Sequence, residues 1–341
     1  MSHLCEPTTA LGRLIPWLAV VLGLLGAALD PTPIATWHLL VFLAFLLIFG
    51  IPHGAIDHLV MARLIARRLL SPASLGLIIA YIVVGGGVVA LWCLAPGWTF
   101  LAFLLVTIYH WGQGELWLLR QSSPGLLRSN AVQGLALVLR GGIPILVPLL
   151  AWPEAFAQVT EAVVGLFGQS AHTTFALVHS AIPAGWVLLL STIALYAVWT
   201  GVGVRRWRPW LLDIAELASL VTFFTLTPPV LAIGLYLCLW HAPRHILRLT
   251  HFMADRPPLH WRQVRTVALA SLPMTLGAAL TFAVVWWLLR QGMLDPLTLM
   301  AGALAGVAAL TAPHVCVVAW MDHRDQIWTL LPSQHSPPPS S

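Results

Sequence analysis

The residues of this sequence whose types and spacing favour chemistry are histidines at the ends of apolar runs. His241 and His245 are four residues apart, so on a helix their imidazoles share one face and can bind one ion together. His53 follows the apolar run 34–49, and His110 lies near the end of another run. Neutral imidazoles without a thiolate suit iron or copper with open positions better than structural zinc, so these four residues predict an iron or copper site.

The composition of the chain places these histidines in a membrane. Of the 341 residues, 59% are hydrophobic and 9% are charged, against about 25% charged in an ordinary soluble domain. We therefore predict an all-α, polytopic transmembrane bundle of about ten helices in the cell (inner) membrane. Residues 1–331 are expected to form a single domain, and the Pro- and Ser-rich tail 332–341 is expected to be disordered. The expected spans are roughly 14–29, 34–50, 74–95, 98–114, 131–150, 183–202, 211–226, 230–247, 266–289 and 297–320.

The basic residues are 17 arginines, and they gather in alternate connections between the expected spans. The positive-inside rule assigns those connections, which include 51–72 and 248–265, and both termini to the cytoplasm. A pI near 9.5 then reflects loops that touch lipid headgroups, and no nucleic-acid partner is implied. On the opposite side, we expect 151–182 to form an amphipathic or re-entrant piece, with a hidden further span as the alternative.

On this topology, five histidines reach one depth, near the cytoplasmic ends of even-numbered helices. They are His53, His110, His241, His245 and His314. Ionisable groups inside a membrane are costly and usually face the bundle interior, so convergence at one depth predicts a metal site there. The apolar walls around such a site imply an apolar substrate taken from the bilayer.

Several polar residues close to these histidines are candidates for a supporting role. Asp57 is expected either to orient an imidazole or to cap the following helix, and Glu115 follows His110 by five residues. Arg244 is expected to reach the lipid headgroups. Pro243, between His241 and His245, is expected to kink its helix and to free carbonyl groups, which favours a cavity at this depth.

Four short motifs resemble those of the Brp/Blh family of membrane β-carotene 15,15′-dioxygenases, and the likeness extends from about residue 34 to 322. They are Pro52-His53-Gly54-Ala55-Ile56-Asp57-His58, Tyr109-His110-Trp111-Gly112, His241-Ala242-Pro243-Arg244-His245 and Pro313-His314. The resemblance implies an iron(II) enzyme that uses O2 to split β-carotene at its central double bond into two all-trans-retinal molecules, commonly for a rhodopsin.

By motif, the resemblance assigns the iron to His53, His110, His241 and His245. The other candidates, which would lie around these ligands, are Asp57, His58, Glu115 and His314.

Two alternatives of other classes remain open from the sequence. The histidine pairs are also compatible with haem ligation, or the bundle with carriage of a small apolar solute. An accessory factor for a rhodopsin would need no metal at all. A haem protein would show a Soret band, and simple transport would leave the solute unchanged.

Overall fold

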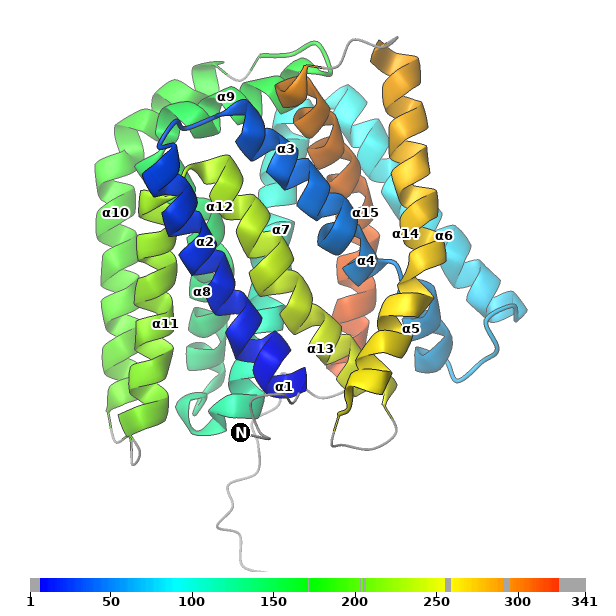
Figure 1. Cartoon of the computed structure of the whole chain (residues 1–341), viewed down its shortest axis with the longest axis horizontal. Coiled ribbons are helices and arrows are strands. Elements are labelled where there is room, and N and C mark those ends of the chain that lie inside the picture. Colours follow the sequence, from blue (N-terminus) through cyan, green and yellow to red (C-terminus); the bar gives the residue numbers. More distant parts are fainter. Residues whose placement is uncertain are drawn as a thin grey trace, which may run out of the picture.

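The computed structural model describes residues 7–170, 172–202, 204, 207–254, 259–290 and 295–324, and within them almost every residue is helical. The first half of the chain forms α1 (Pro7–Thr9), α2 (Ile15–Leu29), α3 (Thr36–Phe45), α4 (Ile51–Gly54), α5 (Asp57–Leu64), α6 (Pro72–Leu94), α7 (Pro96–Ser122) and α8 (Asn130–Ala151). The second half forms α9 (Pro153–Gly165), α10 (His172–Gly201), α11 (Trp207–Leu226), α12 (Pro229–Leu235), α13 (Ala242–Met253), α14 (Trp261–Arg290) and α15 (Pro296–Arg324). Figure 1 shows the long helices side by side in one bundle.

Eight helices of the described part are long and apolar enough to cross a membrane. They are Ala10–Leu29, Pro72–Leu94, Asn130–Ala151, Ser180–Gly201, Trp207–Leu226, Pro229–Met253, Trp261–Thr281 and Pro296–Arg324. The other two expected spans correspond to the shorter apolar helix Thr36–Gly50 and to α7, whose second half carries the polar residues Gln113, Glu115 and Arg120. The prediction of an all-α, polytopic bundle of about ten helices is therefore confirmed.

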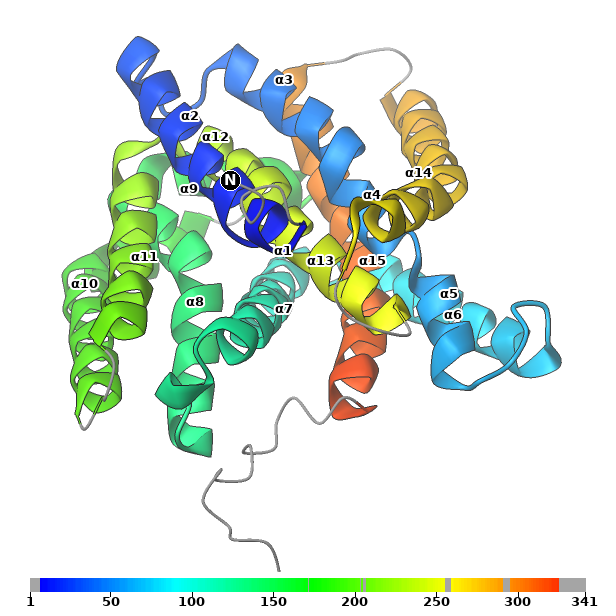
Figure 2. The ribbon, with the colours of Figure 1, turned by 60° about the horizontal axis from the view of Figure 1, so that its bottom comes forward.

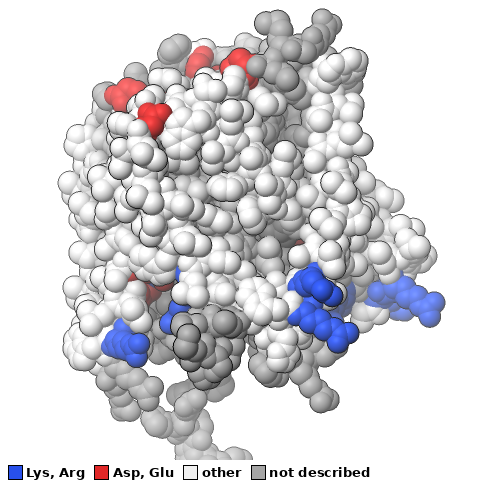
Figure 3. Space-filling model, in the orientation of Figure 1, with Lys and Arg blue, Asp and Glu red and all other residues white. Residues whose placement is uncertain are grey.

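The exposed charged side chains lie mostly at opposite ends of the bundle, whereas several carboxylates are buried inside it. Figure 3 shows blue arginines at one end and red carboxylates at the other. Arg67, Arg128 and Arg262 are exposed at or next to helix ends of the first group. Glu154 and Asp295 are exposed at the starts of α9 and α15, at the opposite ends of the chain's crossings. This separation agrees with the arginine asymmetry that we used to draw the topology; the assignment of the arginine-rich end to the cytoplasm stays a prediction.

The region 151–182, for which the sequence left two alternatives, is divided between two helices. α9 lies across the carboxylate end of the bundle in Figure 1 and buries Ala155, Thr160 and Val163 along one side. The short length of α9, 13 residues, agrees with a surface piece rather than a span. The first residues of α10 extend the following span, so no additional crossing helix is found between them in the described residues.

The closest helix pair, α7 and α8, is joined through glycines. A Cβ atom added at Gly141 would collide with the carbonyl oxygen of Ile108, and one added at Gly112 would collide with that of Leu137. Small residues are how membrane helices bring their backbones together. This contact holds α7, which carries His110, firmly against α8. The tail 332–341 lies outside the described residues, so its disorder and the domain limits stay predictions.

Candidate metal centre

Three buried histidines from three helices meet in the interior of the bundle. His110 on α7, His245 on α13 and His314 on α15 each offer a ring nitrogen, and these nitrogens lie within 4.8 Å of one another. The ring centroids are 4.8 Å apart for His110 and His314, and 5.2 Å apart for His245 and His314. At 1.5 Å per helical residue, the cluster lies about 12–18 Å inside the arginine-rich end. Figure 2 shows the three helices near the middle of the bundle.

The other two predicted ligands border this cluster. The ring of His241 is buried, and its centroid lies 5.0 Å from that of His110 and 5.8 Å from that of His245. The backbone of His53 belongs to α4, and its side chain lies outside the described part. α4 itself packs against the cluster, because a Cβ atom on the next residue, Gly54, would lie 3.5 Å from Nδ1 of His314.

Local breaks in the α-helix precede two of the histidine motifs. The turns Leu46–Gly50 and Tyr236–His241 are π-helical, and each comes shortly before a proline, Pro52 and Pro243 respectively. A proline has no N–H to donate to the carbonyl four residues earlier, and a π-turn is one way in which a helix absorbs that loss. The expected irregularity at Pro243 is therefore present, and it lies beside His241.

Asp57 orients one imidazole of the cluster. Both carboxylate oxygens of Asp57 lie within 2.9 Å of Nδ1 of His314, and Tyr81 Oη donates to Asp57 at 3.0 Å. The carboxylate thus favours the tautomer with hydrogen on Nδ1, which leaves Nε2 with its lone pair for a metal. Of the two roles expected for Asp57, the structure displays orientation of an imidazole, and the imidazole is that of His314.

A second polar layer joins the same three helices closer to the arginine-rich end. Gln113 Nε2 on α7 donates to Asp322 Oδ2 on α15 at 3.0 Å, and Arg248 on α13 forms an ion pair with Asp322. All three side chains are at least 99% buried. Each helix supplies one histidine and one member of this layer, so the layer ties the three helices together beyond the cluster. The distance along the helix is three residues on α7 and α13 and eight residues on α15.

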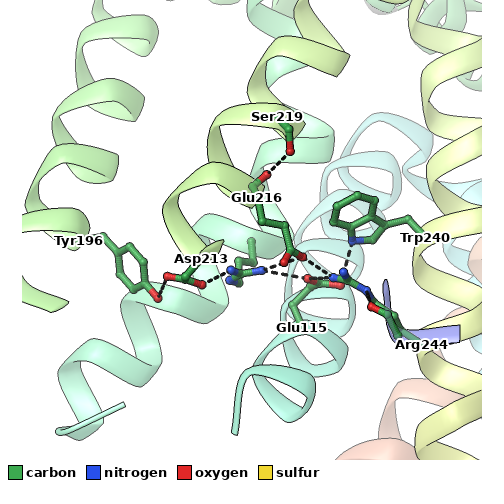
Figure 4. A network of polar contacts seen from close by, with 9 residues as sticks. Glu115, Tyr196, Asp213, Glu216, Ser219, Trp240 and Arg244 are labelled. Atoms are coloured by element: carbon green, nitrogen blue, oxygen red, sulfur yellow. Dashed lines mark hydrogen bonds and ion pairs between the residues drawn. The ribbon is translucent and has the colours of Figure 1, made fainter. Parts of the chain in front are cut away.

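Glu115 and Arg244 belong to a buried ionic network (Figure 4). Arg244 was expected to reach the headgroups, but its guanidinium is 2% exposed and donates to Glu115 at 2.6 Å. Glu115 also accepts from Arg140 and from the indole of Trp240, each at 3.1 Å. Asp213, Glu216 and Tyr196 extend the network.

This network corrects the expectation that Arg244 reaches the lipid headgroups. Arg244 does not extend to the membrane surface. Its guanidinium is buried, and the carboxylates around it offset the cost of removing the charge from water. Glu115 contacts Arg244, the neighbour of His245 in sequence, and the indole of Trp240, the neighbour of His241.

A largely apolar cavity of about 400 Å³ opens beside the cluster. His110 and His314 form part of its wall, together with Asp57 and His58, whose side chain is half-buried. Part of the lining comes from α9 and the helices beside it, which we call the first arm of the cavity, and part comes from α6 and α14, which we call the second arm. The residues that line the first arm include Phe42, Phe100, Phe156, Val159, Ile233 and Met300.

Residues 44–322 of the chain match the family of proteins described as beta-carotene 15,15′-dioxygenase. The chain belongs to this family. It is 34% identical to the probable beta-carotene 15,15′-dioxygenase Blh of Halobacterium salinarum over 330 residues, which cover 94% of this chain and 93% of that protein. It is 29% identical to the probable beta-carotene 15,15′-dioxygenase Brp of the same species, with 84% of each chain covered.

A more distant relative is the beta-carotene 15,15′-dioxygenase of an uncultured marine bacterium. That protein is 24% identical over 289 residues, which cover 81% of this chain and 91% of the relative. No solved structure matches the chain. The family and its relatives thus agree with the resemblance that the histidine motifs carry, and the match includes the elements from the end of α3 to α15.

Among the histidines of this dioxygenase family member, the structure gives His314 a more central place than the sequence did. A lone histidine after Pro313 carries no spacing signal of its own, and its partner Asp57 is 257 residues away. Tyr81, Gln113, Arg248 and Asp322 were also missed. Tyr81 lies in an otherwise apolar run, and the other three resemble ordinary residues near helix ends.

The donors of the cluster fit an iron ion. Three imidazoles in a buried site, one of them held by a carboxylate, are the ligand type that iron accepts while positions stay open for other molecules.

Proposed function

We propose that this protein is a non-haem iron dioxygenase that cleaves the central 15,15′ double bond of β-carotene with O2 to give two all-trans-retinal molecules. The observation that carries the proposal is a cluster of three buried histidines, two of which, His110 and His314, line a largely apolar cavity. The family membership and the names of the relatives support the substrate and the bond that is cleaved.

The proposed ligands are His110, His245 and His314 from the cluster, with His241 and His53 from the predicted set as further ligands. The ring of His241 stands next to that of His110, and α4 brings the backbone of His53 to the same place. Asp57 holds the His314 imidazole, while His58 and Glu115 act from outside the coordination sphere. Since ligands from four separate segments converge, binding of Fe(2+) is coupled to correct packing of the bundle.

Bound Fe(2+) would supply activation of O2 next to the alkene. The residues of the chain position the substrate relative to the metal. Apolar walls from Phe42, Phe100 and Ile233 bind a polyene, exclude water and hold one double bond beside His110 and His314. The reaction balances without another reductant, because the double bond breaks and each oxygen atom of O2 ends in one of the two aldehydes.

The proposed location of the enzyme follows from its apolar helices. Eight apolar helices fit a multi-pass protein of the cell membrane, in contact with lipid, where β-carotene also dissolves. We propose residues 1–331 as one domain with a disordered tail. The retinal product would be available to a rhodopsin in the same membrane.

Expression in a host that accumulates β-carotene tests the proposal directly. We expect the colour to fade and retinal to appear in the extract, and we expect His110→Ala, present at equal abundance, to keep the colour. The purified protein should hold about one non-haem iron per chain, as one site built from several segments requires. A Soret band would favour the haem alternative, and unchanged carotene with bound iron would favour a binding or accessory role.

A further inference from the structure

The second arm of the cavity reaches the side of the bundle between α6 and α14. On α6, it is lined by Ile78, Tyr81 and Ile82, which share one helix face at spacings of three and four residues. On α14, it is lined by Met274 and Ala278, which are again four residues apart. Figures 1 and 2 both place these two helices at the same edge of the bundle.

Two of these lining residues are also part of the outer surface. The side chain of Ile82 is 66% exposed, and that of Met274 is 53% exposed. Because they line the cavity and are also exposed on the surface, these residues mark an opening of the cavity, which we call the mouth. Leu310 of α15, 39% exposed and also in the lining, borders the same region. The cavity therefore opens sideways, through the flank of the protein.

The surface around this mouth is apolar and lies at membrane depth. α6 carries no charged residue, and its exposed neighbours of the mouth include Ile79 and Val83. Ile82 lies ten residues into α6 and Met274 lies 13 residues into α14, so the mouth is about 15–20 Å from the arginine-rich ends of these helices at 1.5 Å per residue. The hydrocarbon core is about 30 Å thick, so the mouth faces acyl chains rather than headgroups.

The route from the mouth to the histidines is short. Tyr81 lies in the lining of the mouth, donates to Asp57, and lies 3.3 Å from the carbonyl oxygen of Leu310. Asp57 in turn holds His314. The mouth, the cluster and the arm toward α9 therefore follow one another along the cavity, with the histidines in its interior.

We propose that the opening between α6 and α14 is the lateral portal through which a long, linear hydrocarbon leaves the bilayer and reaches the histidine cluster. Such a molecule would pass the histidines end first and place its leading end in the arm toward α9, so that an interior bond stops beside the cluster. The lining of the cavity is largely apolar, and on the α9 side it consists of residues such as Phe156 and Val159. This inference rests on the proposed function, because it names the route of that substrate.

The test narrows the portal with tryptophan and compares each variant with a matched neighbour. Ile82→Trp and Met274→Trp place a bulky side chain at the mouth. Ile79→Trp and Leu276→Trp change side chains of similar exposure, 61% and 68%, that are not part of the lining. Full-length protein in lipid vesicles is mixed under anaerobic conditions with vesicles that contain β-carotene, and carotenoid binding is followed by its absorption.

We expect the two mouth variants to bind β-carotene about tenfold or more slowly, as changes that obstruct association do, with the controls at the wild-type rate. On addition of oxygen, carotenoid that is already bound should be cleaved by the mouth variants as fast as by the wild type. Equal binding rates for Ile82→Trp, Met274→Trp and their controls would overturn the portal. Failure of the wild type to cleave bound carotenoid would instead overturn the proposed function, and melting temperatures establish that all four variants are folded.

Discussion

The hydrogen-bonded chain from Tyr81 through Asp57 to His314 makes a graded prediction about the metal. His314→Ala removes one of three clustered ring nitrogens and should abolish stoichiometric iron binding. Asp57→Asn removes the carboxylate that accepts from Nδ1 at 2.8 Å, but leaves the ring. Loss of such a partner typically weakens metal affinity about 10–100-fold, or about 1.4–2.7 kcal/mol.

Tyr81→Phe is the mildest step of the series. It removes one hydrogen bond at 3.0 Å to the carboxylate, while Asp57 keeps its contact with His314. A hydrogen bond to a charged group contributes about 1.5–3 kcal/mol, and only a part of it reaches the metal through Asp57. We therefore expect iron affinity to fall less than about tenfold.

The assay is competition of the purified protein with an iron chelator, together with the visible spectrum of the cobalt-substituted form, which reports ligand number and geometry. The matched control is His38→Ala, since His38 is also a fully buried histidine, on α3, and is not a member of the cluster. Retention of wild-type iron affinity and an unchanged cobalt spectrum in His314→Ala would refute the assignment of His314 as a ligand. The ligands would then be His53, His110, His241 and His245, as the motifs imply.

Three further outcomes are expected. Glu115→Ala should lower abundance and melting temperature strongly, because it removes one of the two carboxylates that the buried Arg140 and Arg244 share and leaves them with Glu216, and breaking buried ion pairs costs about 3–5 kcal/mol; an unchanged melting temperature would show that Glu115 contributes little to stability. Asp322→Asn should reduce iron affinity more than Asp213→Asn, although both remove a buried charge, since Asp322 joins the three histidine-bearing helices and Asp213 does not; the reverse order would argue against a positioning role. A cysteine at Ser71 should be labelled from the cytoplasm and one at Thr32 from outside, if the arginine-rich end faces inward, and labelling from the opposite sides would invert the topology.

The helices and the depth of the site were predictable, because both follow from local patterns. Apolar runs of spanning length mark the helices, and the spacing of His241 and His245 marks one face of a helix. Combination of these patterns with the arginine asymmetry brought His110 and His245 to the same depth, and the structure places their rings 5.4 Å apart.

The partners across the bundle could not be predicted, because they depend on which helices pack together. Glu115 and Arg244 are 129 residues apart, and Asp322 and Gln113 are 209 apart. A single arginine near the end of an apolar helix ordinarily extends to the headgroups, so nothing local indicates that Arg244 turns inward. The contacts of His314 could not be predicted for the same reason, since they join it to Asp57 and to the histidines of α7 and α13.

The spacing of the arginines and histidines of α13 nevertheless indicates which face of the helix is polar. At 100° per residue, His241, Arg244, His245 and Arg248 fall within an arc of about 100° on one helix face. All four are at most 2% exposed, so this helix turns its polar face into the bundle, opposite to a helix at a water surface.

The two arginines on that face are paired with carboxylates of different helices, Arg244 with Glu115 on α7 and Arg248 with Asp322 on α15. Buried charges are costly in a membrane, so helix rotation or sliding that breaks either pair is strongly opposed. His245 lies between the two arginines and is held by both constraints, whereas the cavity side of the cluster is apolar. α13 is therefore held in place by its ion pairs, and the apolar cavity borders the cluster at His110 and His314.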